Sequence, residues 1–139
     1  MSTEYLGCKI LGENIAIPAA QVQEVFETRL LTRLPGVPLF IIGMVNVRGS
    51  VLPVLDPWDA LPSSPPVRKI VILKTGLGLV GLLITALSDL IRFDKEEPAP
   101  HVPADLKKFE RYITGIGIHD ERHFILDGCA LTGEAVKNK

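Results

Sequence analysis

The chain has 139 residues, enough for one domain that buries about two-thirds of its unfolded surface without disulfide staples. Its 15 basic and 16 acidic residues leave a net charge of −1, which argues against nucleic acid as a partner, because phosphate binding relies on clustered Lys and Arg. The two cysteines, Cys8 and Cys129, favour free thiols in a reducing compartment. The N-terminus does not resemble a signal peptide and no apolar run is long enough to span a bilayer, so we expect a cytoplasmic protein without membrane insertion.

In chain order, the sequence predicts short β-strands separated by turns rich in Gly and Pro. Residues 19–26 have apolar positions at helical spacing, but their β-branched content favours a single helical turn that leads into a strand. Residues 57–66 predict a Pro-rich loop, and residues 94–108, rich in Pro, Glu and Lys, predict a solvated loop. The predicted strand regions are 5–11, 14–17, 39–47, 51–55, 68–74, the apolar run 79–93, and two runs within 111–131 around a polar turn at 119–122.

The run 34–55 is uncharged except for one residue, Arg48. Turn chemistry at Gly49-Ser50 predicts a hairpin here, in which period-two alternation places Asn46 and Arg48 on the face opposite Val45. A largely uncharged surface that carries an arginine is typical of the centre of a protein contact. The alternative is that Arg48 merely extends over the edge of a barrel.

The chain also contains an internal repeat. Residues 15–26 align without gaps on residues 80–91, and residues 40–56 align on residues 112–127 with one residue deleted. The repeat predicts two similar half-domains, each a small antiparallel barrel of the SH3-like kind, that share an interface and fold together. Chance similarity between two β-hairpin motifs is the alternative.

Motifs that could carry chemistry are weak. Gly76, Gly78 and Gly81 match G-x-G-x-x-G, but no amphipathic helix follows, which favours hairpin glycines over a nucleotide site. His119 and His123 have the spacing of zinc ligands on a helix, yet they flank a predicted turn between strands. No Ser, Cys or Lys lies in a nucleophile setting, so we expect no catalytic residue, metal site or cofactor.

Residues 40–56 fit the pattern F-I-x-G-x-x-N-x-R-G-x-x-x-P-x-x-D, which resembles the signature of CheW-like domains. VQEVF in the first half, VGLLI in the second and FILD near the end agree with it. The resemblance implies an all-β fold of two five-stranded SH3-like barrels with short helical turns, packed as one domain over residues 1–139. We expect the first barrel to comprise roughly residues 13–66, and the second roughly residues 4–12 with 67–137.

The resemblance further implies a non-catalytic adaptor that couples transmembrane chemoreceptors to a chemotaxis histidine kinase. Its partners would be the cytoplasmic tip of the receptors and the regulatory domain of the kinase. Ile84-Thr85, Pro57-Trp58 and the lack of an obvious long helix after Asp127 depart from the family pattern. An adaptor of a parallel chemosensory pathway, such as one controlling pili and twitching motility, and an unrelated SH3-like peptide-binding module therefore stay open. Carried over by motif, the protein-binding residues are Val22, Glu24, Gly43, Asn46, Arg48 and Gly49.

Overall fold

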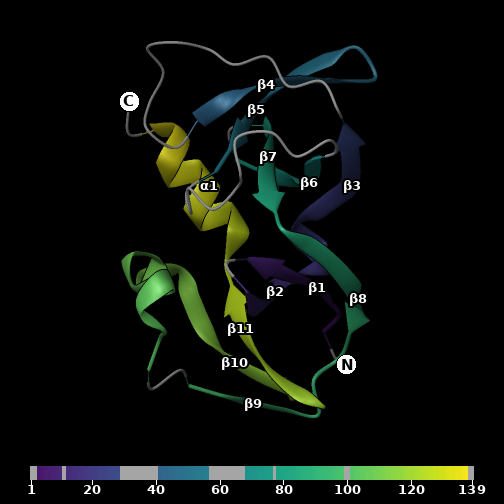
Figure 1. The fold of residues 1–139 in the computed structure, drawn as a ribbon. Coiled ribbons are helices and arrows are strands. Elements are labelled where there is room, and N and C mark those ends of the chain that lie inside the picture. The colour runs from purple at the N-terminus through teal and green to yellow at the C-terminus, as the bar shows by residue number, and fades with distance from the viewer. Residues whose placement is uncertain are drawn as a thin grey trace.

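The computed structural model describes residues 3–10, 12–28, 41–56, 68–76, 78–98 and 101–137, which form two β-sheets, two 3-10 helices and one α-helix (Figure 1). The five-stranded sheet has the order β3-β6-β7-β5-β4, and the six-stranded sheet has the order β8-β1-β2-β11-β10-β9. The predicted all-β class is confirmed, although the second sheet gains a sixth strand because β9 pairs with β10. The elements are β1 Tyr5–Ile10, β2 Glu13–Pro18, η1 Ala19–Gln21, β3 Val22–Thr28, β4 Ile41–Val47, β5 Ser50–Leu55, β6 Arg68–Thr75, β7 Gly78–Ile84, β8 Ala86–Ile91, β9 Lys95–Glu97, η2 Ala104–Tyr112, β10 Ile113–His119, β11 Glu121–Leu126 and α1 Gly128–Lys137. The predicted loop 57–66 lies outside the described residues.

Strand pairing follows the internal repeat. The antiparallel hairpin β1–β2 corresponds to β6–β7, and the hairpin β4–β5 corresponds to β10–β11. Val54 of β5 pairs in parallel with Gly81 of β7, and the equivalent residue of β11, Ile125, pairs in parallel with Ala16 of β2. Equivalent residues therefore make equivalent pairs in both sheets, which the chance-similarity alternative does not explain.

The expected division of the chain between the two barrels is wrong for three strands. β2 belongs to the six-stranded sheet, whereas β6 and β7 belong to the five-stranded sheet. After β2 the chain crosses to the other sheet through η1, and after β7 it crosses back at Thr85, the one residue between β7 and β8. Each sheet therefore takes one hairpin from the opposite half of the sequence.

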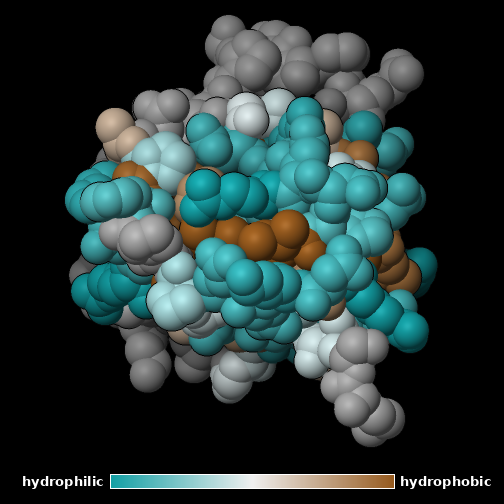
Figure 2. All heavy atoms as spheres, turned by 90° about the horizontal axis from the view of Figure 1, so that it is seen from below, coloured by the Kyte–Doolittle hydropathy of each residue, from teal (hydrophilic) through white to brown (hydrophobic). Residues whose placement is uncertain are grey.

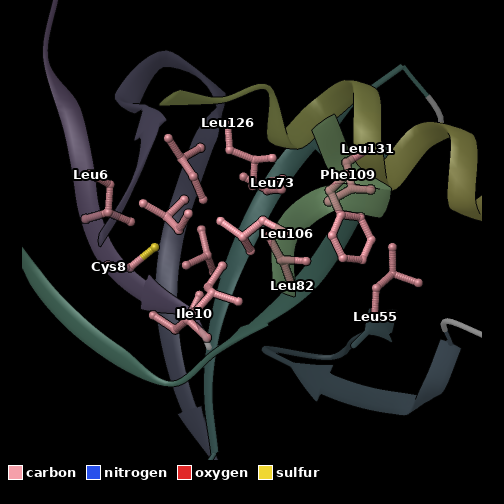
Figure 3. Packing of buried hydrophobic residues seen from close by; sticks show 14 of the residues in the cluster. Leu6, Cys8, Ile10, Leu55, Leu73, Leu82, Leu106, Phe109, Leu126 and Leu131 are labelled. Atoms are coloured by element: carbon pink, nitrogen blue, oxygen red, sulfur yellow. The ribbon is translucent and has the colours of Figure 1, made fainter. Parts of the chain in front are cut away.

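The main hydrophobic core lies between the two sheets. Side chains from β1 and β2 meet side chains from β6 and β7, and α1 and η2 cover them (Figure 3). The prediction of a solvated loop at 94–108 is wrong at both ends, because residues 95–97 form β9 and Leu106 of η2 is 0% exposed in this core. Phe109, later in η2, is 2% exposed. Leu106 and Phe109 are three residues apart, one turn of a 3-10 helix, which places both on the buried side of η2. Val102, just before the helix, joins the same core.

A smaller cluster lies on the other face of each sheet. On the six-stranded sheet the ring of Phe93 stacks on Tyr5, with ring centroids 4.8 Å apart, and on His123 at 5.5 Å. Phe93 lies in the short connection between β8 and β9, the two edge strands of this sheet, and the next residue, Asp94, donates its N–H to the Ile118 carbonyl at 2.9 Å. The sheet must therefore curl until its edges approach each other.

The helix α1 is joined to η1 by side-chain hydrogen bonds. Asp127 Oδ1 accepts the Ala130 N–H at 3.1 Å, as an N-cap does, and also the Gln21 Nε2–H at 2.9 Å. Gln21 Oε1 in turn accepts the Cys129 N–H at 3.2 Å. A helix thus follows Asp127 where the sequence suggested no obvious long one. Within the described part of the chain, no helix is long and apolar enough to cross a membrane.

Candidate partner-binding site

The β4–β5 hairpin turns at Arg48 and Gly49. Val47 pairs with Ser50, which leaves these two residues as the centre of the turn, one position before the predicted Gly49-Ser50. Both have positive φ, 52° for Arg48 and 88° for Gly49. Two positive φ angles are the mark of a type I′ turn, whose twist matches that of the flanking strands.

The side chain of Asn46 closes this turn. Its Oδ1 accepts the Gly49 N–H at 2.9 Å, so an amide that the hairpin ladder does not use is satisfied within the hairpin itself. The alternation predicted for β4 is confirmed, because Val45 and Val47 are buried and Asn46 is exposed.

The Arg48 side chain extends to the opposite edge of the five-stranded sheet. Arg48 Nη1 contacts Glu24 Oε2 on β3, and β3 and β4 are the two edge strands of this sheet. The Arg48 side chain is 77% exposed whereas that of Glu24 is 22% exposed. Because the guanidinium is largely in solvent, the ion pair contributes at most about 1 kcal/mol to stability. The contact therefore orients the guanidinium, and most of its N–H donors stay accessible.

Four of the six predicted protein-binding residues thus touch one another: Glu24, Asn46, Arg48 and Gly49. Val22 instead packs half-buried against the main core. Gly43 is buried in β4 at a register irregularity of the hairpin.

The second copy of the hairpin has a different turn. Asp120, with φ 62°, is the one residue between the paired His119 and Glu121, so the deleted residue of the repeat lies in this turn. The second sheet therefore presents an acidic turn where the first presents Arg48.

Exposed apolar side chains were not singled out by the sequence. Val51, next to the hairpin turn, is 59% exposed, and on the edge strand β8 Leu87 and Leu90 are 39% and 59% exposed. In the repeat, Leu87 and Leu90 align with Val22 and Val25, which are half-buried. The alignment therefore predicted that Leu87 and Leu90 lie on a strand, but it did not predict that they are exposed. Viewed from the end of the molecule that carries β9, apolar residues form a strip enclosed by hydrophilic ones (Figure 2).

The other candidate motifs do not converge on a reactive centre. The two histidines have separate neighbours: His119 Nδ1 is 3.6 Å from Asp94, and His123 packs on Phe93. Among the described residues no group of three or more His, Cys, Asp or Glu could hold a metal ion. Gly78 has φ 110° at a hairpin turn and Gly81 lies within β7, as expected for hairpin glycines.

The two thiols are poor nucleophiles. Burial raises the pKa of Cys8 to about 12. Burial also raises the pKa of Cys129, and the nearby Asp127 carboxylate adds to the effect. Both thiols stay protonated near neutral pH, and the thiolate is the reactive form.

The fold and the site therefore define a two-sheet β scaffold with an exposed polar turn and exposed apolar side chains on strands of both sheets. Residues 4–135 match the CheW-like domain family, and the chain belongs to this family. It is 30% identical over 129 residues to the chemotaxis protein CheW of Klebsiella aerogenes, covering 88% of this chain and 76% of the relative. It is 25% identical over 125 residues to Protein PilI of Pseudomonas aeruginosa, covering 87% and 70%. Its fold matches that of the scaffolding protein TtCheW from Thermoanaerobacter tengcongensis with a TM-score of 0.76 at 24% identity, covering 91% and 90% of the two chains.

Proposed function

We propose that this chain is a non-catalytic cytoplasmic adaptor that joins the cytoplasmic tip of chemoreceptors to the regulatory domain of a chemotaxis histidine kinase. Membership of the CheW-like family supports a coupling role in a chemosensory assembly. The observation that carries the proposal is the Arg48 side chain, which is held by Glu24 on a closed turn and is nevertheless 77% exposed.

An adaptor needs two separate surfaces, and we assign them to exposed side chains on different sheets. The hairpin surface comprises Glu24, Arg48, Gly49 and Val51 on the five-stranded sheet, beside Asn46, which closes the turn. The β8 surface comprises Leu87 and Leu90 on the edge of the six-stranded sheet. Because one continuous core joins the sheets, a partner on each surface would be held at a fixed distance and orientation.

The chemistry of the hairpin surface suits a partner that presents a carboxylate or backbone carbonyl beside an apolar group. Arg48 has unused N–H donors in a planar arrangement, which favours charge-assisted hydrogen bonds. Val51 adds an exposed apolar side chain next to the turn. Binding two partners at once raises their effective concentration for each other, so the adaptor acts through geometry and without a reaction of its own.

Co-sedimentation with receptor fragments and kinase tests the proposal. Arg48→Glu reverses the exposed charge and places it opposite Glu24, which should abolish partner binding. It should leave thermal unfolding nearly unchanged, because the Arg48 side chain is 77% exposed and contributes little to stability. Lys107→Glu is the matched control: Lys107 is also an exposed cation beside a carboxylate, that of Glu110 at 2.7 Å, but it lies on η2. Equal co-sedimentation of the Arg48→Glu variant and wild type would contradict the proposal.

A second candidate is an adaptor of a parallel chemosensory pathway, which the similarity to Protein PilI favours. The two candidates differ in the kinase and receptors bound, not in the site. Identifying the kinase recovered with the tagged chain from its native cells separates them. Recovery of unrelated peptides without any kinase would instead support an SH3-like peptide-binding module.

A further inference from the structure

Beside the exposed turn, one polar side chain of β4 already makes a hydrogen bond within the hairpin. Asn46 uses its Oδ1 to accept the Gly49 N–H at 2.9 Å, whereas Arg48 projects into solvent. Building on the proposed function, we propose that Asn46 is a positioning residue: its side-chain oxygen fixes the Arg48-Gly49 turn, and it does not contact the partner.

The turn needs such support because Arg48 is in the left-handed region. A residue with a Cβ pays roughly 1–2 kcal/mol to adopt positive φ, and Arg48 does so at 52°. Gly49, at 88°, does so without that penalty. Turns with negative φ at the first central residue are therefore the natural competitors, and they splay the strands. The hydrogen bond from Gly49 to Asn46 favours the observed turn over those competitors.

The turn conformation also decides where Arg48 points. Positive φ changes the direction of the Cα–Cβ bond relative to a strand residue, and here the guanidinium reaches Glu24 across the edges of the sheet. The β10–β11 turn shows that a hairpin of this repeat can close without this device, because Asp120 alone makes it. Closure of the hairpin alone therefore does not explain why position 46 carries an asparagine. The need to hold Arg48 in one direction does explain it.

Two substitutions separate positioning from direct contact. Asn46→Ala removes the acceptor, whereas Asn46→Asp keeps an acceptor oxygen and removes the amide N–H donors. The probe is the isolated regulatory domain of a chemotaxis histidine kinase from the same organism, with the Kd measured by calorimetry. Measuring at about 0.1 M and about 0.5 M salt screens the charge that the Asp variant adds.

We expect Asn46→Ala to raise the Kd about five-fold, the effect of losing one net hydrogen bond, and Asn46→Asp to stay within about two-fold of wild type at high salt. Without any partner, amide exchange at Gly49 should be about five-fold faster in the Ala variant and unchanged in the Asp variant. Asn14→Ala is the control, since it removes another asparagine hydrogen bond, to Glu121 at 3.1 Å, and should leave Gly49 exchange unchanged.

The outcomes are distinguishable. A wild-type Kd for Asn46→Ala overturns the positioning role while the proposed function stands. Loss of binding by Asn46→Asp at high salt, with Gly49 still protected, also overturns it, because the amide would then touch the partner directly. If the wild-type chain does not bind the kinase domain, the proposed function fails, and this role of Asn46 in it fails as well.

Discussion

Replacing Gly117 with alanine should destabilise the protein, although alanine is normally the better residue in a strand. A Cβ at position 117 would lie 2.1 to 2.3 Å from three ring atoms of Phe93. The ring would have to leave its place over β10, and with it the stacking on Tyr5 and His123. Inserting a group into a packed site costs about 1–3 kcal/mol, and we expect about 2 kcal/mol here because the ring is only half-buried.

Thermal unfolding measures this cost. In a domain of this size about 2 kcal/mol should lower the Tm by roughly 7 °C. Gly76→Ala is the matched control, because a Cβ there would meet nothing within 4 Å, and it should change stability by no more than about 0.5 kcal/mol. Binding at the hairpin surface should be unaffected, since that surface lies on the other sheet.

A double-mutant cycle with Phe93→Ala tests the cause. Once the ring is removed, the Gly117→Ala substitution has nothing to displace, so its cost should disappear in that background. Equal costs in the presence and absence of the ring, or a wild-type Tm for Gly117→Ala alone, would refute this account of how the six-stranded sheet is packed.

Three further substitutions probe other features. Gly49→Val should cost about 1–2 kcal/mol in urea unfolding through backbone strain at φ 88°, because a Cβ there meets nothing within 4 Å; an unperturbed curve would contradict the turn. Gln21→Ala should cost about 1–3 kcal/mol by removing the bonds to Asp127 and Cys129, and would show no loss if solvent replaced both. Because burial raises the folded-state pKa of Cys8 from 9.0 to about 12, the folded thiol keeps its proton where the unfolded one loses it. The free energy of unfolding should therefore fall as pH rises from 9 towards 12, less steeply in Cys8→Ala; identical slopes would contradict the burial.

Local pattern predicted the strands and the hairpin well. In β4, alternation alone placed Val45 inside and Asn46 outside, because the side-chain period of a strand is fixed by its backbone. It failed for η2, where the charged composition hid the helical spacing of Leu106 and Phe109. The charged residues that dominate the composition of that segment lie on its exposed side. Three apolar residues, Val102, Leu106 and Phe109, are enough to form its buried side.

Non-local features could not be read from the sequence. The repeat revealed two equivalent halves, but no local signal indicates which sheet a hairpin joins after a crossing as short as Thr85. The same holds for the contact between Arg48 and Glu24, which depends on how two edge strands approach each other. The motif therefore predicted candidate residues. Only the fold shows that Val22 and Gly43 lie apart from the other four, Glu24, Asn46, Arg48 and Gly49.

The exchange of hairpins between the halves has a consequence for the order in which the chain can fold during synthesis. The five-stranded sheet lacks β6 and β7 until β7 has left the ribosome. In the six-stranded sheet, β2 cannot pair on one of its edges until β11, near the end of the chain, has been made. Pairs this distant in sequence are slow to form. Neither half of the repeat should therefore be a stable product when the gene is cut between the two copies, whereas the two fragments, expressed together, should assemble into the complete pair of sheets.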